Sequence, residues 1–94
     1  MTKGLEWYQR GCYRKSLEYF FRAYELCSAS DMLDGVAMSL NNIGAIYRIT
    51  GNYEEAVSYF DEAYAIYSDL NNQKEAVKAL SNKAATFICM GNLD

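Results

Sequence analysis

Hydrophobic residues recur at intervals of three and four along most of the chain, which is the spacing of one face of an α-helix and not the alternation of a strand. Four stretches carry the pattern, with apolar members Leu17, Phe20, Phe21, Tyr24 and Cys27; Val36, Leu40, Ile43 and Tyr47; Ala56, Tyr59, Phe60, Ala63, Ile66 and Tyr67; and Val77, Leu80, Ala84, Phe87 and Ile88. Together with a shorter stretch at the start, the pattern predicts about five helices, over residues 2–10, 13–29, 32–50, 53–70 and 73–90. The turns between them are so short that neighbouring helices must run antiparallel, so the sequence predicts an all-α fold of helix hairpins.

Residues at the junctions support these bounds. The helix ends are marked by residues that accept a left-handed backbone before a sharp reversal, namely Gly11, Gly51, Gly91 and Asn71. The starts are marked by a side-chain oxygen with an acid three residues later, at Asp31, Asn52 and Asn72. We therefore expect these three residues to cap the helices that follow them.

The chain also repeats itself with a period of 40 residues, which separates Gly11, Gly51 and Gly91. Residues 11–28 laid over 51–68 align Tyr13/Tyr53, Tyr19/Tyr59, Phe20/Phe60, Ala23/Ala63 and Tyr24/Tyr64. Residues 40–52 laid over 80–92 align Leu40/Leu80, Asn42/Asn82, Ala45/Ala85 and Asn52/Asn92. A repeat of this length running through the chain indicates a solenoid of stacked helix pairs.

One glycine falls inside a predicted helix rather than at its end. Gly44 stands in the middle of residues 32–50, and Gly4 and Ala84 are its counterparts in the repeat. Glycine in a helix interior costs about 1 kcal/mol relative to alanine. We expect the facing helix of the same hairpin to approach Gly44 so closely that a side chain would collide with it.

The composition indicates the domain organisation, the cellular compartment and the kinds of partner to expect. The chain has 94 residues, 51% of them hydrophobic, and no proline, which fits one domain without a linker. Three cysteines, an odd number without a close pair, favour a reducing compartment, so we expect a cytoplasmic protein. The net charge of −3 argues against nucleic acid, and no apolar run approaches the ~18 residues of a membrane span.

The usual catalytic and cofactor motifs are missing. The sequence contains no histidine and no glycine-rich phosphate loop, so we expect no enzyme activity, no metal and no cofactor. An acidic group, Glu54, Glu55, Asp61 and Glu62, is placed by its spacing on the exposed side of a helix, which favours a solvated face over a calcium site. The recurring tyrosines are expected to pack within the hairpins, whereas Tyr8 points away from its hairpin partner and is a candidate ligand contact.

The residues Leu40, Ile43, Gly44, Tyr47, Gly51, Tyr53, Ala56, Phe60 and Ala63 have the spacing of the tetratricopeptide repeat, which this chain resembles over its whole length. The resemblance implies a right-handed superhelical stack of antiparallel hairpins that acts as a non-enzymatic protein–protein interaction scaffold. It divides the single domain, residues 1–94, into a partial repeat (1–30), a full repeat (31–70) and the first helix of a third repeat (71–94). The 40-residue period exceeds the usual ~34, so the helices must be longer, as in LGN-like (Pins) scaffolds, kinesin light chain and bacterial regulatory domains that bind peptides or response regulators.

In such a stack the first helix of each repeat lines the concave side, which predicts a groove. The residues facing it are Leu5, Tyr8, Met38, Asn41, Asn42, Ala45, Arg48, Lys78, Ser81, Asn82, Ala85 and Cys89. Tyr8, Asn41, Asn42, Arg48, Lys78 and Asn82 are the candidate contacts to a protein or peptide partner, with amides for its backbone and two cations for an acidic group. The alternative is that Asn42 and Asn82 bond each other or support packing between successive helices.

Three further expectations concern the partner. Of the five positions of the two-carboxylate clamp found in chaperone-binding members, only Asn42 and Lys78 match, because Met1, Leu5 and Asn82 occupy the others, so no clamp is expected. Helix 73–90 has no following helix to cover its apolar side, so part of that side should be exposed and invite self-association, although Lys83 replaces an aliphatic residue there. The alternative function is a regulatory or sensory segment cut from a larger bacterial signalling or transcriptional-regulatory protein.

Overall fold

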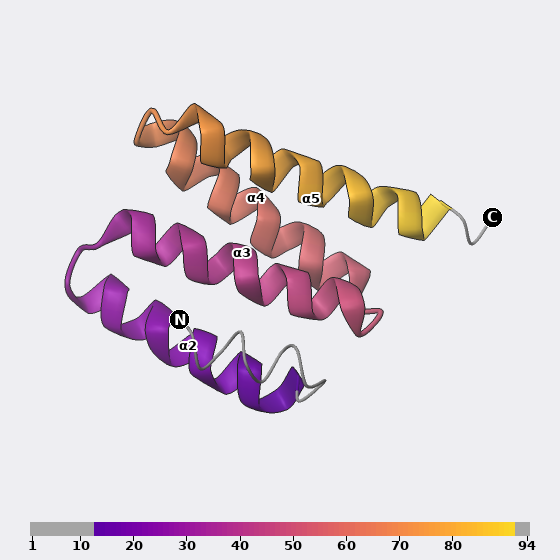
Figure 1. Cartoon of the computed structure of the whole chain (residues 1–94), viewed down its shortest axis with the longest axis horizontal. Helices are drawn as coiled ribbons and strands as arrows, with labels where there is room; N and C mark the ends of the chain where they lie inside the picture. The colour runs from indigo at the N-terminus through magenta and orange to yellow at the C-terminus, as the bar shows by residue number, and fades with distance from the viewer. Residues whose placement is uncertain (1–12, 92–94) are drawn as a thin grey trace.

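Four helices make up the part of the chain that the computed structural model describes, residues 13–91 (Figure 1). They are α2 (Tyr13–Ala29), α3 (Leu33–Ile49), α4 (Tyr53–Asp69) and α5 (Gln73–Gly91). Each bound lies within one residue of the helix predicted from the hydrophobic pattern. The structure thus describes four helices where the pattern predicted about five, and the expected helix over residues 2–10 lies outside the described residues.

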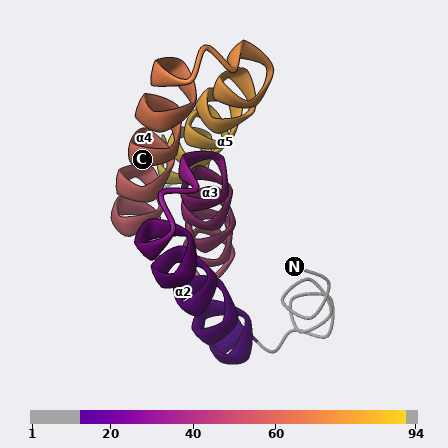
Figure 2. The ribbon, with the colours of Figure 1, turned by 90° about the vertical axis from the view of Figure 1, so that its left-hand side faces the viewer.

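The helices stack in chain order, each antiparallel to the next. α3 packs against both α2 and α4, and α4 packs in turn against α5. Figure 2 shows α3 and α5 on the side toward which the stack curves and α4 on the outer side. α3 and α5 are in contact with each other at only a few residues. The two helices together form the inner surface of the stack.

Each of the three reversals is closed by a left-handed residue with a pair of backbone hydrogen bonds. Asp31, Gly51 and Asn71 have φ of 56°, 87° and 58°. The N–H groups of the residues that follow donate back to the ends of the helices, Met32 to Cys27, Asn52 to Tyr47 and Asn72 to Tyr67, over 2.8–2.9 Å. This is the Schellman arrangement, and it satisfies carbonyls that would otherwise have no partner.

The predicted helix ends at Gly51, Asn71 and Gly91 are confirmed, although Gly91 lacks the expected left-handed backbone, and the predicted helix start at Asp31 is wrong. Asp31 was expected to cap the next helix but supplies the left-handed residue that closes α2, because aspartate tolerates this conformation and a tight reversal requires it. Gly91 is the last residue of α5 and does not have a positive φ. In the other three turns the left-handed residue donates one of the two bonds, as Gly51 N–H does to the Arg48 carbonyl, and the next residue donates the other. The residues after Gly91 lie outside the described part.

The two asparagine caps differ from each other. Asn72 Oδ1 accepts a hydrogen bond from the backbone N–H of Glu75 at 3.4 Å, as predicted. Asn52 stands at the expected position, yet its side chain makes no cap and donates instead to Thr50 Oγ1 at 3.0 Å. The Thr50 hydroxyl is itself bonded to the Ile46 and Tyr47 carbonyls, so this series of side-chain bonds completes the end of α3 rather than the start of α4.

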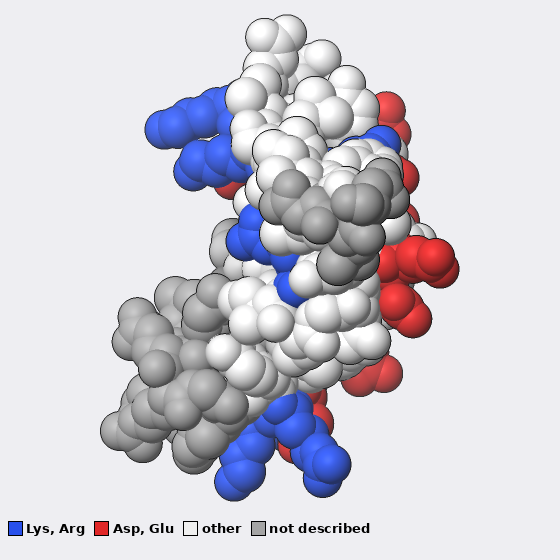
Figure 3. Space-filling model, turned by 90° about the vertical axis from the view of Figure 1, so that its right-hand side faces the viewer, with Lys and Arg blue, Asp and Glu red and all other residues white. Residues whose placement is uncertain are grey.

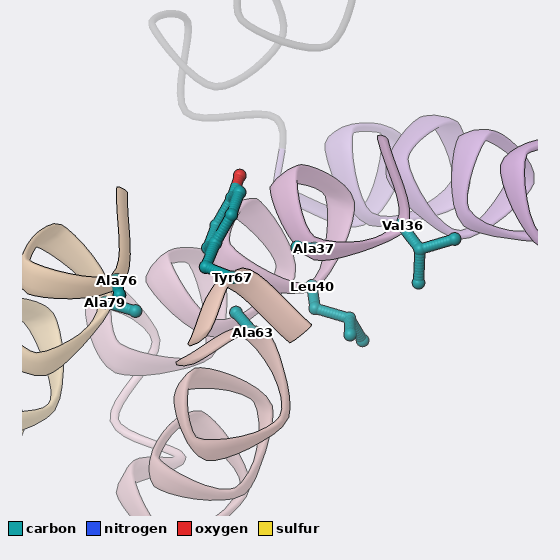
Figure 4. Close-up of a cluster of buried hydrophobic side chains, with 7 residues drawn as sticks. All are labelled: Val36, Ala37, Leu40, Ala63, Tyr67, Ala76 and Ala79. Carbon is teal, nitrogen blue, oxygen red and sulfur yellow. The ribbon is translucent and has the colours of Figure 1, made fainter. Parts of the chain in front are cut away.

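α3 carries the centre of the core. One buried cluster joins α3, α4 and α5 through Val36, Ala37, Leu40, Ala63, Tyr67, Ala76 and Ala79 (Figure 4). A second joins α2 to α3 through Phe20, Ile43 and Ile46. Because α3 contributes to both, removing its apolar side chains would separate the two halves of the stack.

The mid-helix glycine has the close neighbour that the sequence predicted. A Cβ atom on Gly44 would lie 2.7 Å from Cε1 of Phe60, whose ring is fully buried in the facing helix of the same hairpin. Gly35 has the same property toward α2, since a Cβ there would lie 2.6 Å from Cys27 Sγ. Gly35 was not predicted to be a close contact, and its counterpart in the next repeat is Glu75.

Several recurring tyrosines pack inside the stack, as expected. The Tyr59 ring stacks on Tyr47 with centroids 5.5 Å apart and meets the edge of Phe21 at 6.1 Å, so three helices share one aromatic group. Burial raises the pKa of Tyr59 above its ordinary value, and neighbouring tyrosines and carboxylates add to the shift. Tyr64 departs from the expectation because its ring is exposed.

Candidate partner-binding surface

The predicted groove residues that the structure describes lie on α3 and α5, and none of them is buried. Apart from the adjacent positions 41–42 and 81–82, they follow one another at intervals of three and four, which keeps them on one face of each helix. The opposite faces of these helices supply the core. We call this set the α3/α5 surface: Met38, Asn41, Asn42, Ala45, Arg48, Lys78, Ser81, Asn82, Ala85 and Cys89. Leu5 and the candidate contact Tyr8 lie outside the described residues.

One hydrogen bond crosses the α3/α5 surface. Asn82 Nδ2 donates to Asn41 Oδ1 over 3.1 Å, joining the first helices of two successive repeats. It is the kind of helix-to-helix bond considered as the alternative to ligand binding, but its acceptor is Asn41 and not Asn42. Two of the six candidate contacts are therefore in direct contact with each other.

Asn42 has an unused donor. Its Nδ2 atom is buried and has no hydrogen-bond partner among residues 13–91. A buried donor without a partner costs about 1–3 kcal/mol, so the interior of the stack gains nothing from this amide. The side-chain oxygen of the neighbouring Asn41 accepts a hydrogen bond from Asn82. Of these two adjacent asparagines, Asn41 therefore bonds another helix through its side chain, whereas the side-chain donor of Asn42 is not used by any residue that the structure describes.

The two predicted cations lie at different levels of the surface. Because Asn82 is level with Asn41, Lys78 is level with the residues near Met38, ten positions before Arg48 in α3. At a rise of 1.5 Å per residue, the two cations stand about 15 Å apart along the helix axes. Lys78 Nζ is exposed and bonds Glu75 at 3.1 Å, whereas Arg48 makes no ion pair with any described residue.

Charge is divided between the two sides of the stack. Figure 3 shows a hollowed side with Lys and Arg at its margins and the acidic side chains gathered on the opposite side. α4 carries five acids and no base, all of them exposed: Glu54, Glu55, Asp61, Glu62 and Asp69. The members of the predicted acidic group are thus solvated, and within residues 13–91 no three potential ligands come close enough to hold a metal ion.

Lys83 has a partner that was not predicted from the sequence. Lys83 Nζ lies 2.7 Å from Asp61 Oδ1 of α4, and 5.9 Å from the centroid of the Phe87 ring. One repeat earlier the equivalent positions are Ile43 and Phe21, and Phe21 packs against the buried cluster that contains Ile43. The alignment of the repeats at an offset of 40 residues could have revealed this ion pair. Between successive repeats, Ile43 is replaced by Lys83 in the first helix, and Phe21 is replaced by Asp61 in the helix that packs against it.

Comparison with known proteins agrees with this geometry. A family model described as tetratricopeptide repeat matches residues 6–69. Among solved structures, the solution NMR structure of the designed protein DA05 superposes with a TM-score of 0.82 at 20% identity, covering 87% of this chain and 82% of that one. No curated protein matches the chain. Within the described residues, no helix combines the length and the apolar character that crossing a membrane requires.

Proposed function

The chain belongs to the tetratricopeptide repeat family, and from this premise we propose that it holds an extended, acidic segment of a partner protein on the α3/α5 surface. Domains of this family are typically non-enzymatic and generally mediate protein–protein interaction. The specific surface and the acidic character of the segment are our proposal. The helices, of 17 to 19 residues, suit the long-helix kind of repeat that LGN-like scaffolds, kinesin light chain and bacterial regulatory domains represent.

The separation of charge carries this proposal. The five acids of α4 are exposed on the helix that lies on the outer side of the stack (Figure 2). Arg48 belongs to the α3/α5 surface and has no ion-pair partner among the described residues. A guanidinium binds a carboxylate through two parallel hydrogen bonds, and a nearby apolar wall strengthens the interaction by excluding water. Since Arg48 and Lys78 are about 15 Å apart along the axes, the segment would be extended and carry two separated acids.

The amides supply the second kind of contact. An extended peptide presents backbone N–H and C=O groups that a side-chain amide can bond regardless of sequence. Asn42 is half-buried and its donor has no partner among the described residues, so this amide would bond a peptide after turning its Nδ2 toward the surface. Asn82 is less free, since its donor already bonds Asn41, and a peptide would meet only its oxygen.

Selection from a random peptide library tests the proposal. Short peptides displayed on phage would be selected on the folded chain, and the affinity of the winners measured by fluorescence anisotropy. We expect enrichment of two separated Asp or Glu residues and at least about tenfold weaker binding for Arg48→Ala, since removing the guanidinium removes both of its charge-assisted hydrogen bonds. Arg22→Ala, on the exposed side of α2, is the matched control. Equal losses for the two variants would refute the assigned surface.

Two other expectations from the sequence stay predictions. Self-association through α5 is tested by light scattering over a range of concentrations. Origin in a larger bacterial regulatory protein is tested by the sequence of the gene that flanks this segment.

A further inference from the structure

Apolar side chains are exposed at one end of the stack, at the turn from α2 to α3 and the turn from α4 to α5. Met32 is 55% exposed, Leu33 49% and Leu70 40%. Figure 2 looks onto this end of the stack, with the turn from α4 to α5 at the top and the turn from α2 to α3 below it. The apolar side of α5 is partly exposed as well, as predicted, but the exposed residues at the turns were not predicted from the sequence.

A hollow lies between these two turns. It measures about 410 Å³, which is within the range of ligand-binding pockets. We call it the turn hollow and define it by the residues that line it: Asp31, Met32, Leu33, Asp34, Leu70 and Asn72. It therefore has room for large side chains of a partner.

The repeat shows that the fold does not require the apolar and acidic residues of the turn hollow. At the offset of 40 residues, each apolar member has a polar counterpart: Met32/Asn72, Leu33/Gln73 and Leu70/Ser30. Asp34 corresponds to Lys74, so even the sign of the charge differs. The two turns nevertheless have the same backbone, since φ is 56° at Asp31 and 58° at Asn71. These exposed side chains are thus available for binding.

The turn hollow contains two exposed acids. Neither Asp31 nor Asp34 forms an ion pair with a residue that the structure describes. Lys78 is bonded to Glu75 at 3.1 Å and not to either aspartate. Lys74 follows in the next turn but does not line the hollow. The hollow therefore combines an apolar surface with two negative charges that a partner could neutralise.

This combination distinguishes between possible occupants. The anionic surface of a membrane would be repelled by both aspartates, although apolar residues are exposed there. An acidic segment, of the kind proposed for the α3/α5 surface, would be repelled for the same reason. A basic segment with a large apolar residue is attracted by the charge and gains from burying Leu33 and Leu70, and opposite charge also raises its rate of association.

We propose that the turn hollow is a docking site for a short basic segment of a partner protein, in which a large apolar side chain enters the hollow and neighbouring Lys or Arg residues pair with Asp31 and Asp34. The site is separate from the α3/α5 surface and selects the opposite charge, so either proposal can fail alone. Because it is built by two internal turns, every residue that lines it lies within the described part of the chain.

The experiment selects random peptides displayed on phage that bind the wild-type chain and removes those that also bind a variant. The variant, Met32→Asn/Leu33→Gln/Asp34→Lys, carries the residues found at the same places one repeat later, so the fold should survive. We expect the remaining peptides to have a large apolar residue next to Lys or Arg. In an NMR titration of the isotope-labelled chain, a synthetic copy of such a peptide should shift the amides of residues 31–34 and 70–72.

Fluorescence anisotropy then measures the affinity of this peptide. The triple variant should bind at least tenfold more weakly, and Asp34→Asn, which keeps the size of the side chain, at least threefold more weakly. High salt should weaken binding to the wild type more than binding to Asp34→Asn. Ile49→Gln/Glu54→Lys makes the same kinds of change at exposed positions on the opposite end of the stack and is the matched control. This control and Arg48→Ala should both bind as the wild type does.

Four results would overturn the proposal. No peptide remains after the selection, or the remaining peptides lack the basic and apolar residues. Alternatively, Asp34→Asn binds as tightly as the wild type at every salt concentration, so that the aspartate does not select the partner. Finally, sedimentation shows a dimer of the wild type that the triple variant abolishes, in which case a second copy of the chain occupies the hollow.

Discussion

Asn82 of α5 donates its side-chain amide to Asn41 of α3 over 3.1 Å, and this bond fixes the spacing of the two helices that line the proposed peptide surface. α3 and α5 have few other contacts, since α4 packs between them on the outer side. This partly buried pair of amides contributes little free energy, but it lies where α3 and α5 meet and holds the two helices in register. It sets the width of the surface on which Asn42 and Arg48 lie.

The first prediction concerns this bond. Asn41→Ala and Asn82→Ala should each lower the free energy of unfolding by about 1 kcal/mol, the usual net value of a hydrogen bond. The double variant should cost about as much as either single variant, because one interaction is lost in each case. Urea unfolding measures all three, with the exposed neighbour Ser81→Ala as control. Additive losses would show that the two amides act independently.

A companion experiment separates structure from binding. Asn42→Ala removes a donor that has no partner in the stack, so the free energy of unfolding should stay the same or rise. If this residue bonds the backbone of a peptide, the same variant should bind the selected peptides several-fold more weakly. A loss of stability without a loss of affinity would assign Asn42 to the fold.

The helices could be predicted almost residue by residue, because an amphipathic period of three and four has one interpretation when the intervening turns are short. Gly44 could be predicted as well, since a glycine in a helix interior is costly unless a neighbour requires it. The turns were harder. Asp31 and Asn71 lie in left-handed conformations, while Asn72 caps a helix, and the same residue types serve both purposes.

The second prediction tests the contact of Gly44 with Phe60. Gly44→Ala should lower the free energy of unfolding by about 1–3 kcal/mol, because a Cβ 2.7 Å from a fully buried ring forces the two helices apart. Gly91→Ala is the matched control, since a Cβ there meets nothing and alanine favours the helix. Adding Phe60→Leu to Gly44→Ala should recover part of the loss. Equal stability of the Gly44→Ala and Gly91→Ala variants would contradict the close approach.

The ion pair and the hydrogen bond that join different helices could not be predicted from the sequence. Lys83 was recognised as an exception to the apolar pattern, and Asp61 was placed among solvated acids, but a single helix does not show which residue faces it. Asn41 was named as a candidate ligand contact, yet its bond with Asn82 depends on how α3 and α5 are offset along their axes. Offsets of this kind come from packing, which the hydrophobic pattern of one helix does not record.

The third prediction follows from the exchange of an apolar pair for an ion pair between repeats. Asp61→Phe with Lys83→Ile restores the residues found one repeat earlier and should raise the free energy of unfolding by about 1 kcal/mol, because a partly exposed ion pair contributes little. The wild type should lose a little stability in high salt, and the double variant should not. Lys78→Ala, which breaks a pair inside α5, is the control and should change stability by less than about 0.5 kcal/mol. A less stable double variant would mean that the ion pair is required at this junction.

The fourth prediction concerns alkaline pH. Burial raises the pKa of Tyr67 above its ordinary value of 10.0, and the carboxylates of Glu75 and Asp34 raise it further. Below pH 10 the phenol is neutral in both the folded and the unfolded chain. Above that value the unfolded chain loses the proton first, so it binds fewer protons than the folded chain and the free energy of unfolding falls as pH rises.

Tyr67→Phe should therefore flatten the decline of stability that urea unfolding measures from about pH 8 to about pH 11. Tyr64→Phe is the control, because Tyr64 lies on the same helix but is exposed, and it should leave the decline unchanged. The tyrosinate absorbance of the folded wild type should also rise later than that of the unfolded chain. If Tyr67→Phe and Tyr64→Phe alter the decline equally, burial of Tyr67 does not limit stability at high pH.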